Sequence, residues 1–488
     1  MAASKLQDLK NAAMEEVNNK KGNVGLVHLF FLLSVVLCVV LYAPRVFVVV
    51  PYRADFFAAV DSNRSAPMGV LRHADGNAED GGVVVHLDNQ VRSPCSAMRN
   101  HSICCDRSDF NTDVCFMSGD VRTDAASLSL LLFTPKNITA TAEEEEERVR
   151  PYTRKWERLI MGTVQEVRLR RVEEKEADDG AHRCDVVHEA PLLVMTAGGY
   201  TGNFFHAFSD GFLPAWLTVQ HLRRRVVLGV LAYNPWWAGT FREIISGLSG
   251  YPVVDLLNDK RAHCFPGAIV GTRFHGILSV DPARLRDNKT VADFHHFLAA
   301  AYEVKQQEEK RERRRPRLGI VSRKGTRVIE NQAAVARLAS SVGFDVSILE
   351  TANGMPLSAV YAAVSACDAL VGVHGADLTK FLFLRPGKAS LAQIAPIGIS
   401  PIARDCFGKP AKRMGLLYEQ YEVAGRESSL SRKYALHDVV LTDPETAVRR
   451  NGGWKFVANV YLRGQNVTLD LDRFRDTLLR MHSHALLR

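Results

Sequence analysis

Two short loops in the C-terminal half of the chain carry residue types that can bind a diphosphate. The first contains Arg323, Lys324 and Arg327 after the apolar run LGIVS, and the second contains His374 and Gly375 after the apolar run ALVGV. Arginine offers a planar fork of donors to two phosphate oxygens, and lysine adds a point charge. The glycine turn leads into a pattern of helical spacing, and a helix start points unpaired N–H groups at a bound anion. Together the loops predict one diphosphate site beyond two strand ends.

In such a site the cations would neutralise the negative charge that grows on a departing nucleoside diphosphate, so that no metal would be required. His374 would donate to the same diphosphate or orient the donor sugar. The alternative for the cations is ordinary surface solvation, and for His374 it is a hydrogen-bonded core histidine.

A second group of candidate residues lies in the segment GNFFHAFSDGFLPAWLTVQHL. Asn203, His206 and Asp210 have the spacing of one helix face, while the aromatic residues between them mark the opposite, buried face. His206 and Asp210 are predicted to form the catalytic base for an acceptor hydroxyl, with Asn203 on the acceptor side; which of the pair takes the proton is left open. A purely structural hydrogen bond is the alternative. Pro214 removes the hydrogen bond to the Asp210 carbonyl and predicts a kink.

The elements that must position these residues alternate between strand and helix. Strands are predicted at 191–198, 224–233, 252–257 and 268–272, and again at 317–324, 344–350, 369–375 and 389–396, with helices between them. This rhythm predicts parallel sheets covered on both faces, hence an α/β protein. The domain boundaries that follow are an acceptor domain with a cysteine-rich entry at 91–290, a linker helix at 291–316, a nucleotide-sugar-binding domain at 317–430 and a tail at 431–488 that packs across both domains.

The N-terminal region predicts a membrane anchor. Residues 24–43 contain no fixed charge over about the length that crosses a bilayer, which separates a cytosolic tail at 1–23 from a stem at 44–90. All N-glycosylation sequons follow this span, which indicates a lumenal catalytic domain. They begin at Asn63, Asn100, Asn137, Asn288 and Asn466.

Cysteine usage and charge agree with that compartment. Of the 9 cysteines, Cys38 lies in the span, and the cluster from Cys95 to Cys115 predicts disulfides rather than a zinc site. The pairing of the remaining cysteines is left open. The formal net charge of +8 would suit nucleic acid, but behind a lumenal anchor anionic sugar nucleotides are the expected partners.

Taken together, CCDRSDFNTDVCFMSGDVR, GNFFHAFSDG, VSRKGTR and GVHGADLT followed by FLRPG resemble glycosyltransferase family 61, and its plant branch of xylan arabinosyl- and xylosyltransferases in particular. The resemblance implies a single-pass type II Golgi membrane protein with two Rossmann-like domains (GT-B fold). It also implies inverting, metal-independent transfer from a UDP-sugar. Where Asp377 stands, the family's commoner form has glycine. A carboxylate there would repel a diphosphate unless it caps the helix or pairs with Lys380.

The function expected from these features is transfer of arabinose or xylose from a UDP-sugar to a xylan-type wall polysaccharide. The UDP-sugar is a substrate and no cofactor is expected; a complex with other Golgi enzymes is a further expectation. Two alternatives stay open: a glycosyltransferase acting on protein-linked glycans, as a beta-1,2-xylosyltransferase would, and a non-catalytic subunit that binds glycans or scaffolds a Golgi complex.

Overall fold

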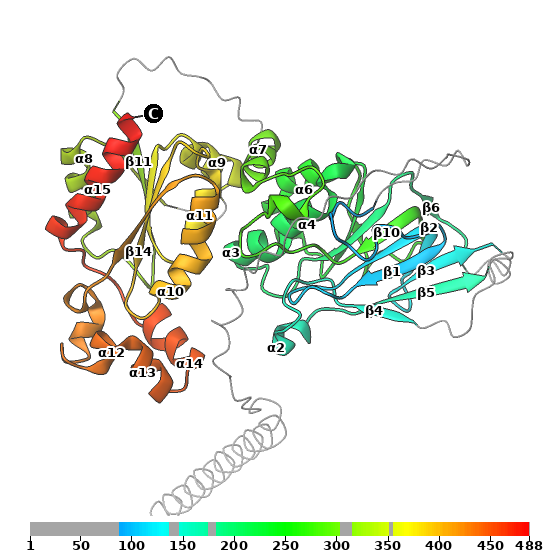
Figure 1. Ribbon diagram of the computed structural model, residues 1–488, viewed down its shortest axis with the longest axis horizontal. Coiled ribbons are helices and arrows are strands. Elements are labelled where there is room, and N and C mark those ends of the chain that lie inside the picture. Colours follow the sequence, from blue (N-terminus) through cyan, green and yellow to red (C-terminus); the bar gives the residue numbers. More distant parts are fainter. Residues whose placement is uncertain (1–86, 136–145, 174–181, 303–314, 351–354, 488) are drawn as a thin grey trace, which may run out of the picture. The chain divides into compact units, whose positions relative to one another are not determined.

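The computed structural model describes residues 87–135, 146–173, 182–302, 315–350 and 355–487. Within these ranges the chain forms a mixed α/β structure with two sheets (Figure 1). The predicted cytosolic tail and span, most of the stem and the sequons at Asn63 and Asn137 lie outside them. A search of the same ranges finds no helix with the length and apolar character of a membrane span.

The first sheet has 10 strands, of which eight follow the order β4-β5-β3-β2-β10-β7-β8-β9, while β1 pairs with β2 and β6 with β10. Its strands are β1 Ser102–Asp106, β2 Val114–Asp124, β3 Ser129–Thr134, β4 Glu147–Val149, β5 Val167–Glu173, β6 Val186–Val187, β7 Leu192–Thr196, β8 Val227–Leu231, β9 Val254–Asp255 and β10 His263–Val270. Only part of this sheet is the predicted parallel sheet: β10, β7, β8 and β9 are parallel, whereas β2 pairs antiparallel with β1, β3 and β10.

Helices pack on one face of the first sheet, where apolar residues of β7 and β8 join those of α4, α6 and α7 in one core cluster. The opposite face is filled by a second cluster drawn from the strands themselves and the loops beside them. The expectation of helices on both faces is therefore wrong for this sheet, because its own strands pack against one another there. The helices are α2 Arg158–Met161, α3 Phe204–His206, η3 Ala207–Phe212, α4 Leu213–Val219, η4 Gln220–Leu222, α5 Pro235–Thr240, α6 Arg242–Leu248, η5 Pro282–Arg284 and α7 Val291–Ala301.

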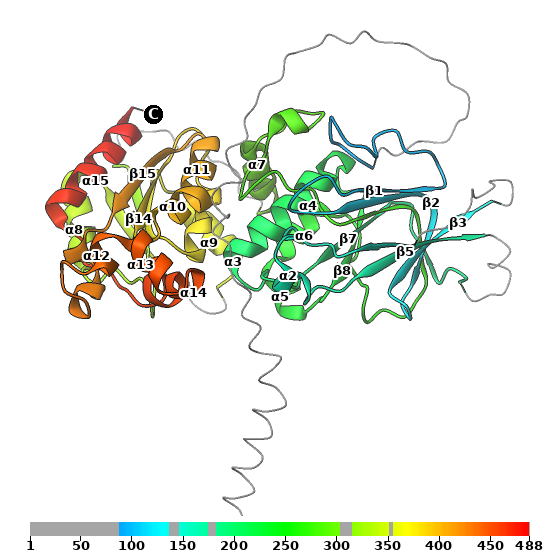
Figure 2. The same cartoon turned by 60° about the horizontal axis from the view of Figure 1, so that its bottom comes forward.

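The second sheet has the order β12-β11-β13-β14-β15, and every neighbouring pair is parallel. Its strands are β11 Arg317–Val321, β12 Asp345–Leu349, β13 Ala369–Val373, β14 Ser390–Ala395 and β15 Leu417–Glu422. Its helices are α8 Gln332–Val342, α9 Leu357–Ser365, η6 Ala376–Phe383, α10 Ser400–Ala403, η7 Arg404–Gly408 and α11 Lys409–Arg413. They lie on both faces, with α8 on one and α9 to α11 on the other (Figures 1 and 2).

Four of these strands were predicted, whereas β15 was not. Strand order reverses between β11 and β13, since β12 lies on the far side of β11. In open parallel sheets this switch point is where ligands bind, beyond the carboxyl ends of the strands. The two predicted diphosphate loops follow the two strands that flank it.

The C-terminal segment returns to the second sheet. It comprises η8 Gly425–Glu427, η9 Ser429–Arg432, α12 Val439–Thr442, α13 Pro444–Arg450, α14 Trp454–Phe456, η10 Val457–Leu462 and α15 Leu471–Leu486. The buried residues Phe474, Leu478 and Met481 of α15 join the core under α8 and the second sheet. The tail was expected to pack across both domains. Its helix α15 packs against the half of the chain that contains the second sheet. The predicted boundaries themselves stay predictions, and residues 303–314 of the linker lie outside the described ranges.

Three disulfides form among the described cysteines: Cys95–Cys104, Cys105–Cys115 and Cys184–Cys264. The cysteine cluster is therefore a disulfide-linked entry, as predicted. Cys367 and Cys406 are free thiols.

A buried ion cluster ties this entry segment to the first sheet. Arg273, at the end of β10, is 4% exposed, and its guanidinium donates to Asp106 Oδ2 at 2.5 Å and to Asp88 Oδ2 at 2.6 Å. Burial alone would raise the pKa of Asp106, but hydrogen bonds from Ser108 and Arg273 outweigh it and hold that pKa below its ordinary value. A carboxyl with a depressed folded-state pKa stabilises the fold above its unfolded pKa of about 3.9, and this contribution is lost as pH falls further.

Asp106→Asn should therefore weaken the pH dependence of stability below about pH 4. Urea unfolding at pH 6 and at pH 3.5 gives the free energy of unfolding at each pH. Between pH 6 and pH 3.5 this free energy should fall more for the unmodified chain than for the variant. Asp120→Asn, at an exposed ion pair with Arg122, is the control and should leave the loss unchanged. Equal losses in all three proteins would contradict the prediction.

Candidate active site

The two diphosphate loops meet at the switch point of the second sheet. Gly375 has φ 153° and ψ 173°, a backbone region that is essentially restricted to glycine. A Cβ atom at this position would lie 2.6 Å from Arg323 Nη1 and 3.3 Å from Arg327 Nη1. The absence of a side chain thus lets two guanidinium groups approach the turn after β13. Gly375 is followed by η6, which is a 3-10 helix rather than the α-helix expected from the sequence.

Arg327 is arranged as an anion ligand would require. Its Nη1 donates to the His374 carbonyl at 3.0 Å, while its Nε is buried without a hydrogen-bond partner among the described residues. Burial, with the neighbouring charge of Arg323, lowers its pKa to about 10. Unpaired buried donors are costly, and a phosphate oxygen would relieve both the unmet hydrogen bond and the excess positive charge.

His374 is a neutral hydrogen-bond donor in this environment. It is 6% exposed, and burial together with the charges of Arg327 and Arg323 lowers its pKa to about 3. The Gln393 amide Nε2 lies 2.8 Å from Nδ1 and donates to it, and Tyr418 Oη donates to Gln393 Oε1 at 2.8 Å, which fixes the amide. The imidazole proton then sits on Nε2, so His374 can donate to an anion without carrying a charge.

His206 and Asp210 form a dyad in the first half of the chain. His206 Nδ1 lies 2.7 Å from Asp210 Oδ2, and the side chains are 22% and 2% exposed. Burial would raise the pKa of Asp210, but the hydrogen bond from His206 and the charge of Arg154 keep it low, so the group is a carboxylate. With Nδ1–H donating to it, the Nε2 lone pair of His206 is left to take a proton. Asp210 is too enclosed to touch a hydroxyl, so it orients His206.

Two residues that sequence reasoning did not select support the dyad. Tyr152 Oη and Arg154 Nε donate to Asp210 Oδ2 at 3.1 and 2.8 Å. Arg154 Nη2 also lies 3.2 Å from His206 Nδ1, but this contact is not a hydrogen bond, because Nδ1 carries the proton that it donates to the carboxylate. Gly199, after β7, has φ +61°, and a Cβ there would lie 2.7 Å from the Tyr152 ring. The segment PYTRKWE that supplies both has no helix or strand periodicity, and its mixture of aromatic and charged residues was the only signal.

The helix that carries the dyad has wider turns here than an α-helix. Residues Ala207–Phe212 form a π-helix, in which Leu213 N donates to the Phe208 carbonyl. Pro214 has no N–H for the Asp210 carbonyl, and Thr153 Oγ1 donates to it instead at 3.3 Å. The distortion expected from Pro214 is therefore present, and such π segments are frequent at functional sites.

Phe407 connects the dyad with the diphosphate turn. Its ring lies 5.4 Å from that of Phe205, which precedes His206, and 5.3 Å from the ring of His374. It belongs to η7, a second π-helical segment that the sequence did not reveal. Phe205 in turn lies 5.1 Å from the His206 ring, so two aromatic rings, Phe407 and Phe205, link the turn after β13 to the dyad.

Comparison with known proteins identifies the family. The profile described as Glycosyltransferase 61 matches residues 204–391, a stretch that includes the dyad and both diphosphate loops. A xylan glycosyltransferase of Arabidopsis thaliana is 37% identical over 414 residues, which is 82% of this chain and 83% of that protein. This chain belongs to glycosyltransferase family 61.

Two rice relatives support the same assignment. A beta-1,2-xylosyltransferase of Oryza sativa subsp. japonica is 35% identical over 394 residues, covering 77% of this chain and 83% of that protein. An alpha-1,3-arabinosyltransferase of the same organism is 32% identical over 382 residues, covering 77% and 64%. The chain is thus a glycosyltransferase, as the resemblance of its motifs implied.

Asp377 stands where the resemblance implied glycine. Its Oδ2 accepts from Arg323 Nη1 at 3.4 Å and its Oδ1 from Lys380 Nζ at 3.2 Å. The pairing with Lys380 was one of the two ways foreseen to accommodate a carboxylate here. The contact with Arg323 means that Asp377 competes with a diphosphate for one of its ligands.

Asp377→Gly should therefore strengthen UDP binding by up to about fivefold, because the half-exposed ion pair it removes is worth at most about 1 kcal/mol. Isothermal titration of the full chain with UDP measures this. Asp377→Asn, which removes charge but not volume, should give a similar gain. Unchanged or weaker binding in both variants would show that Asp377 does not compete for Arg323.

The structure does not bring every predicted site residue to the site. The Lys324 side chain is 87% exposed and has Glu350 3.9 Å away, so it does not join Arg323 and Arg327. Asn203 is the N-cap of α3, where its Oδ1 accepts from Phe205 N at 2.9 Å, and this gives it a structural role. Of the sequons, Asn100 and Asn288 are exposed. The Asn466 amide is engaged, since its Oδ1 accepts from Val328 N at 3.1 Å.

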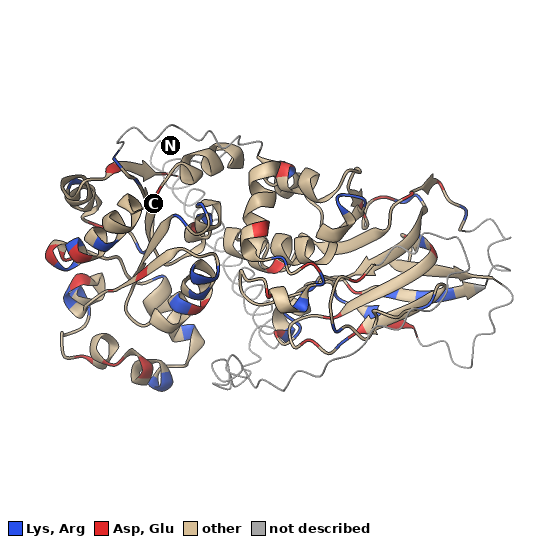
Figure 3. Ribbon diagram, turned by 45° about the horizontal axis from the view of Figure 1, so that its top comes forward, with Lys and Arg blue, Asp and Glu red and all other residues tan. Residues whose placement is uncertain are grey.

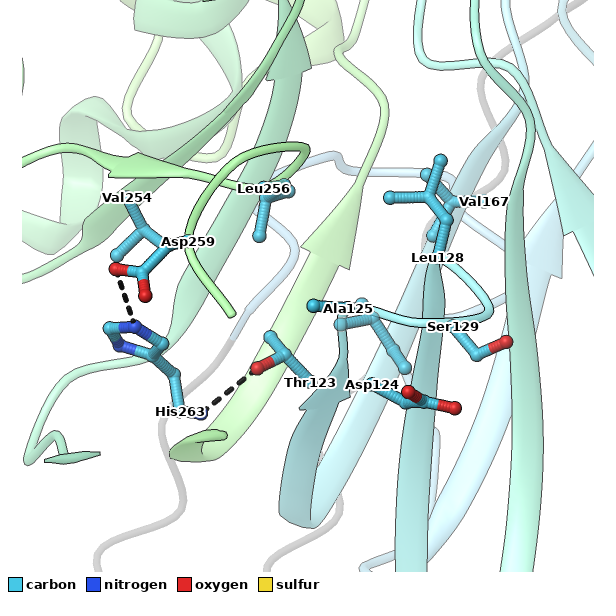
Figure 4. Close-up of a pocket in the computed structure, with 11 residues that line it drawn as sticks. Thr123, Asp124, Ala125, Leu128, Ser129, Val167, Val254, Leu256, Asp259 and His263 are labelled. Carbon is cyan, nitrogen blue, oxygen red and sulfur yellow. Dashed lines mark hydrogen bonds and ion pairs between the residues drawn. The ribbon is translucent and has the colours of Figure 1, made fainter. Parts of the chain in front are cut away.

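The first half of this glycosyltransferase also contains a small cavity that is separate from the candidate site. It is lined by Thr123, Leu128, Val254 and His263 among others, with a volume of about 20 Å³ (Figure 4). That volume holds roughly one water molecule. His263 is held by Asp259 at 3.1 Å and donates its backbone N–H to Thr123 Oγ1, so these polar groups are satisfied within the fold. The cavity is too small for a sugar.

Proposed function

We propose that this chain transfers a pentose, arabinose or xylose, from a UDP-pentose to a xylan-type cell-wall polysaccharide. The observation that carries the proposal is the convergence of Arg323, Arg327 and His374 on the Gly375 turn, which the rings of Phe407 and Phe205 link to the His206–Asp210 dyad. The choice of pentose and of polysaccharide rests on the relatives, which are named for transfer of xylose or arabinose or for xylan.

In the proposed mechanism the acceptor hydroxyl gives its proton to His206 Nε2 while its oxygen attacks the anomeric carbon. The bond between that carbon and the phosphate oxygen breaks with inversion, and UDP leaves with both bonding electrons. Arg323, Arg327 and the His374 Nε2–H stabilise the charge that develops on UDP. Two permanent cations and a neutral donor supply the stabilisation that a metal ion provides in other transferases, and we propose a metal-independent reaction on that ground.

The architecture and location that accompany this function are also proposals. We propose a GT-B arrangement with two Rossmann-like domains, supported by the parallel strands β10-β7-β8-β9 and by the wholly parallel second sheet. We propose a type II Golgi membrane protein anchored through residues 24–43, supported by the one-sided sequons and the disulfides. A complex with other Golgi enzymes stays a prediction. Protease protection in microsomes, with and without glycosidase, tests the orientation.

A donor screen tests the activity. The full chain in detergent is offered UDP-xylose, UDP-arabinose, UDP-glucose and UDP-N-acetylglucosamine with xylan oligosaccharides or protein-derived N-glycans as acceptors. Transfer of a pentose to the xylan oligosaccharide, with the linkage read from the product, supports the proposal. Transfer to N-glycans alone, or failure of UDP to bind at all, would refute it.

A further inference from the structure

A second cavity lies away from the dyad and the diphosphate turn. It has a volume of about 400 Å³ and is lined by residues of α4, η4, α6 and α7. Of these helices, α6 and α7 lie side by side (Figure 1). The volume is within the ordinary size range of small-ligand sites, about 300–1,000 Å³. Gln220, at its edge, follows His206 by about 14 residues on one nearly continuous helix, so the cavity is roughly 20 Å from the dyad at a helical rise of about 1.5 Å per residue.

The rim of this cavity is basic. Arg223 and Arg224 line it, both are exposed, and neither side chain has a hydrogen bond or ion pair with any residue that the structure describes. Lys289 faces the same space, held by Gln220 Oε1 at 2.5 Å and lying 5.9 Å from the centre of the Trp216 ring. Elsewhere acidic and basic side chains are interspersed along the chain (Figure 3). Here three cations share one concave surface.

The acidic groups nearby offset this charge only in part, because none of those that the structure describes pairs with Arg223 or Arg224. Asp293 also lines the cavity, but its Oδ2 accepts from both Thr290 N and Thr290 Oγ1 at the start of α7. Asp287 accepts from Gln220 Nε2 at 2.7 Å and lies 3.7 Å from Lys289. Both carboxylates thus already have partners at the edge of the cavity, whereas the two arginines are available to an anionic ligand.

The backbone at the two arginines is unusual. Arg223 has φ 49° and Arg224 φ 69°, so two consecutive non-glycine residues are left-handed. This conformation is unfavourable for a residue with a side chain, and such residues cluster at ligand sites. Aromatic side chains complete the cavity, since Trp216 and the half-buried Phe297 both line it.

These features favour one class of ligand. A guanidinium fork matches a carboxylate, and an aromatic ring can pack against the apolar C–H face of a sugar. A phosphate group would also seek backbone N–H groups at a helix start. The start of α7 offers few, because Thr290 and Asp293 already form a capping box there. The carboxyl end of η4, which carries partial negative charge, suits a phosphate dianion still less.

We propose that this cavity binds a carboxylate-bearing sugar unit, a uronic acid, of the acceptor polysaccharide at a distance from the reacting hydroxyl. The inference rests on the proposed transfer to a polysaccharide and adds a preference for acidic chains. Arg223 and Arg224 bind the carboxylate, Lys289 contributes charge, and Phe297 packs against the sugar ring.

Calorimetric titration of the full chain in detergent, without any UDP-sugar, tests this. The probes are a xylo-oligosaccharide carrying one uronic acid and the neutral oligosaccharide of equal length. We expect at least tenfold tighter binding of the acidic probe, with the preference shrinking as salt is raised. Equal affinity for both probes would overturn the proposal. So would displacement of the acidic probe by an equal concentration of inorganic phosphate.

The variant Arg223→Gly/Arg224→Gly removes both cations while suiting the left-handed backbone, so the fold should be retained. It should bind both probes equally, whereas Arg225→Ala, an exposed neighbour that does not line the cavity, should keep the preference. An unchanged preference in the double variant would overturn the proposal. A chain that binds the acidic probe but transfers no pentose would refute the proposed function alone. Pentose transfer without any acidic preference would refute only the uronic acid site.

Discussion

Replacing His206 with alanine should reduce kcat for pentose transfer by about 10²–10⁴-fold, the usual contribution of a general base. Its Nε2 carries the lone pair that the dyad leaves for the acceptor proton, whereas Tyr152 and Arg154, the other described side chains that hydrogen-bond to the Asp210 carboxylate, both act as donors there. Initial rates with saturating donor and acceptor measure the effect. UDP affinity should stay the same, because the diphosphate turn lies on the other side of Phe407.

Asp210→Asn provides the companion measurement. It keeps the shape of the side chain but removes the charge that fixes the His206 tautomer, and a large loss of kcat with little change in KM is expected. His437→Ala, which removes an exposed histidine in the C-terminal segment, should leave kcat unaffected. Full activity in the His206 variant would exclude this dyad from the chemistry.

Replacing Arg323 or Arg327 with alanine should lower kcat by about 10²–10³-fold and weaken UDP binding as well, because each removes a preorganised donor from a leaving diphosphate. The effect of Arg327→Ala should be the larger of the two. Its guanidinium is buried and has an unpaired Nε, whereas Arg323 already shares its charge with Asp377. Replacing either arginine with lysine should retain little activity, since an ammonium group cannot offer the forked pair of donors of a guanidinium group.

Lys324→Ala is the matched control on the same loop. Its ammonium group is exposed and remote from the Gly375 turn, so transfer should change far less than in the arginine variants. A loss equal to that of Arg327→Ala would show that the loop rearranges on donor binding and that the resting geometry does not define the site.

The parts of the site that could be predicted are those that depend on residues close together in the sequence. The strand ends before Arg323 and His374, and the shared face of His206 and Asp210, follow from apolar runs, glycine and helical spacing within about ten residues. Gly375 could be singled out because a turn after a buried strand needs a residue without a Cβ.

What could not be predicted depends on contacts across long stretches of chain. Tyr152 and Arg154 reach Asp210 across more than fifty residues from a segment without periodicity. The antiparallel pairing of β2 with β10 likewise joins strands separated by well over a hundred residues, so the first sheet could not be recognised as mixed. Phe407 lies in an irregular helical turn that resembles an ordinary loop in sequence.

The loop that carries the arginines has its backbone secured by residues near the far end of the chain. Arg327 N donates to the Gln465 carbonyl at 2.8 Å, and Val328 N donates to Asn466 Oδ1 at 3.1 Å. A premature stop codon shortly before Gln465 would therefore disturb this loop while sparing Arg323, Arg327 and His374 themselves. An oligosaccharide attached to Asn466 would stand on the amide whose Oδ1 holds Val328, directly beside this loop.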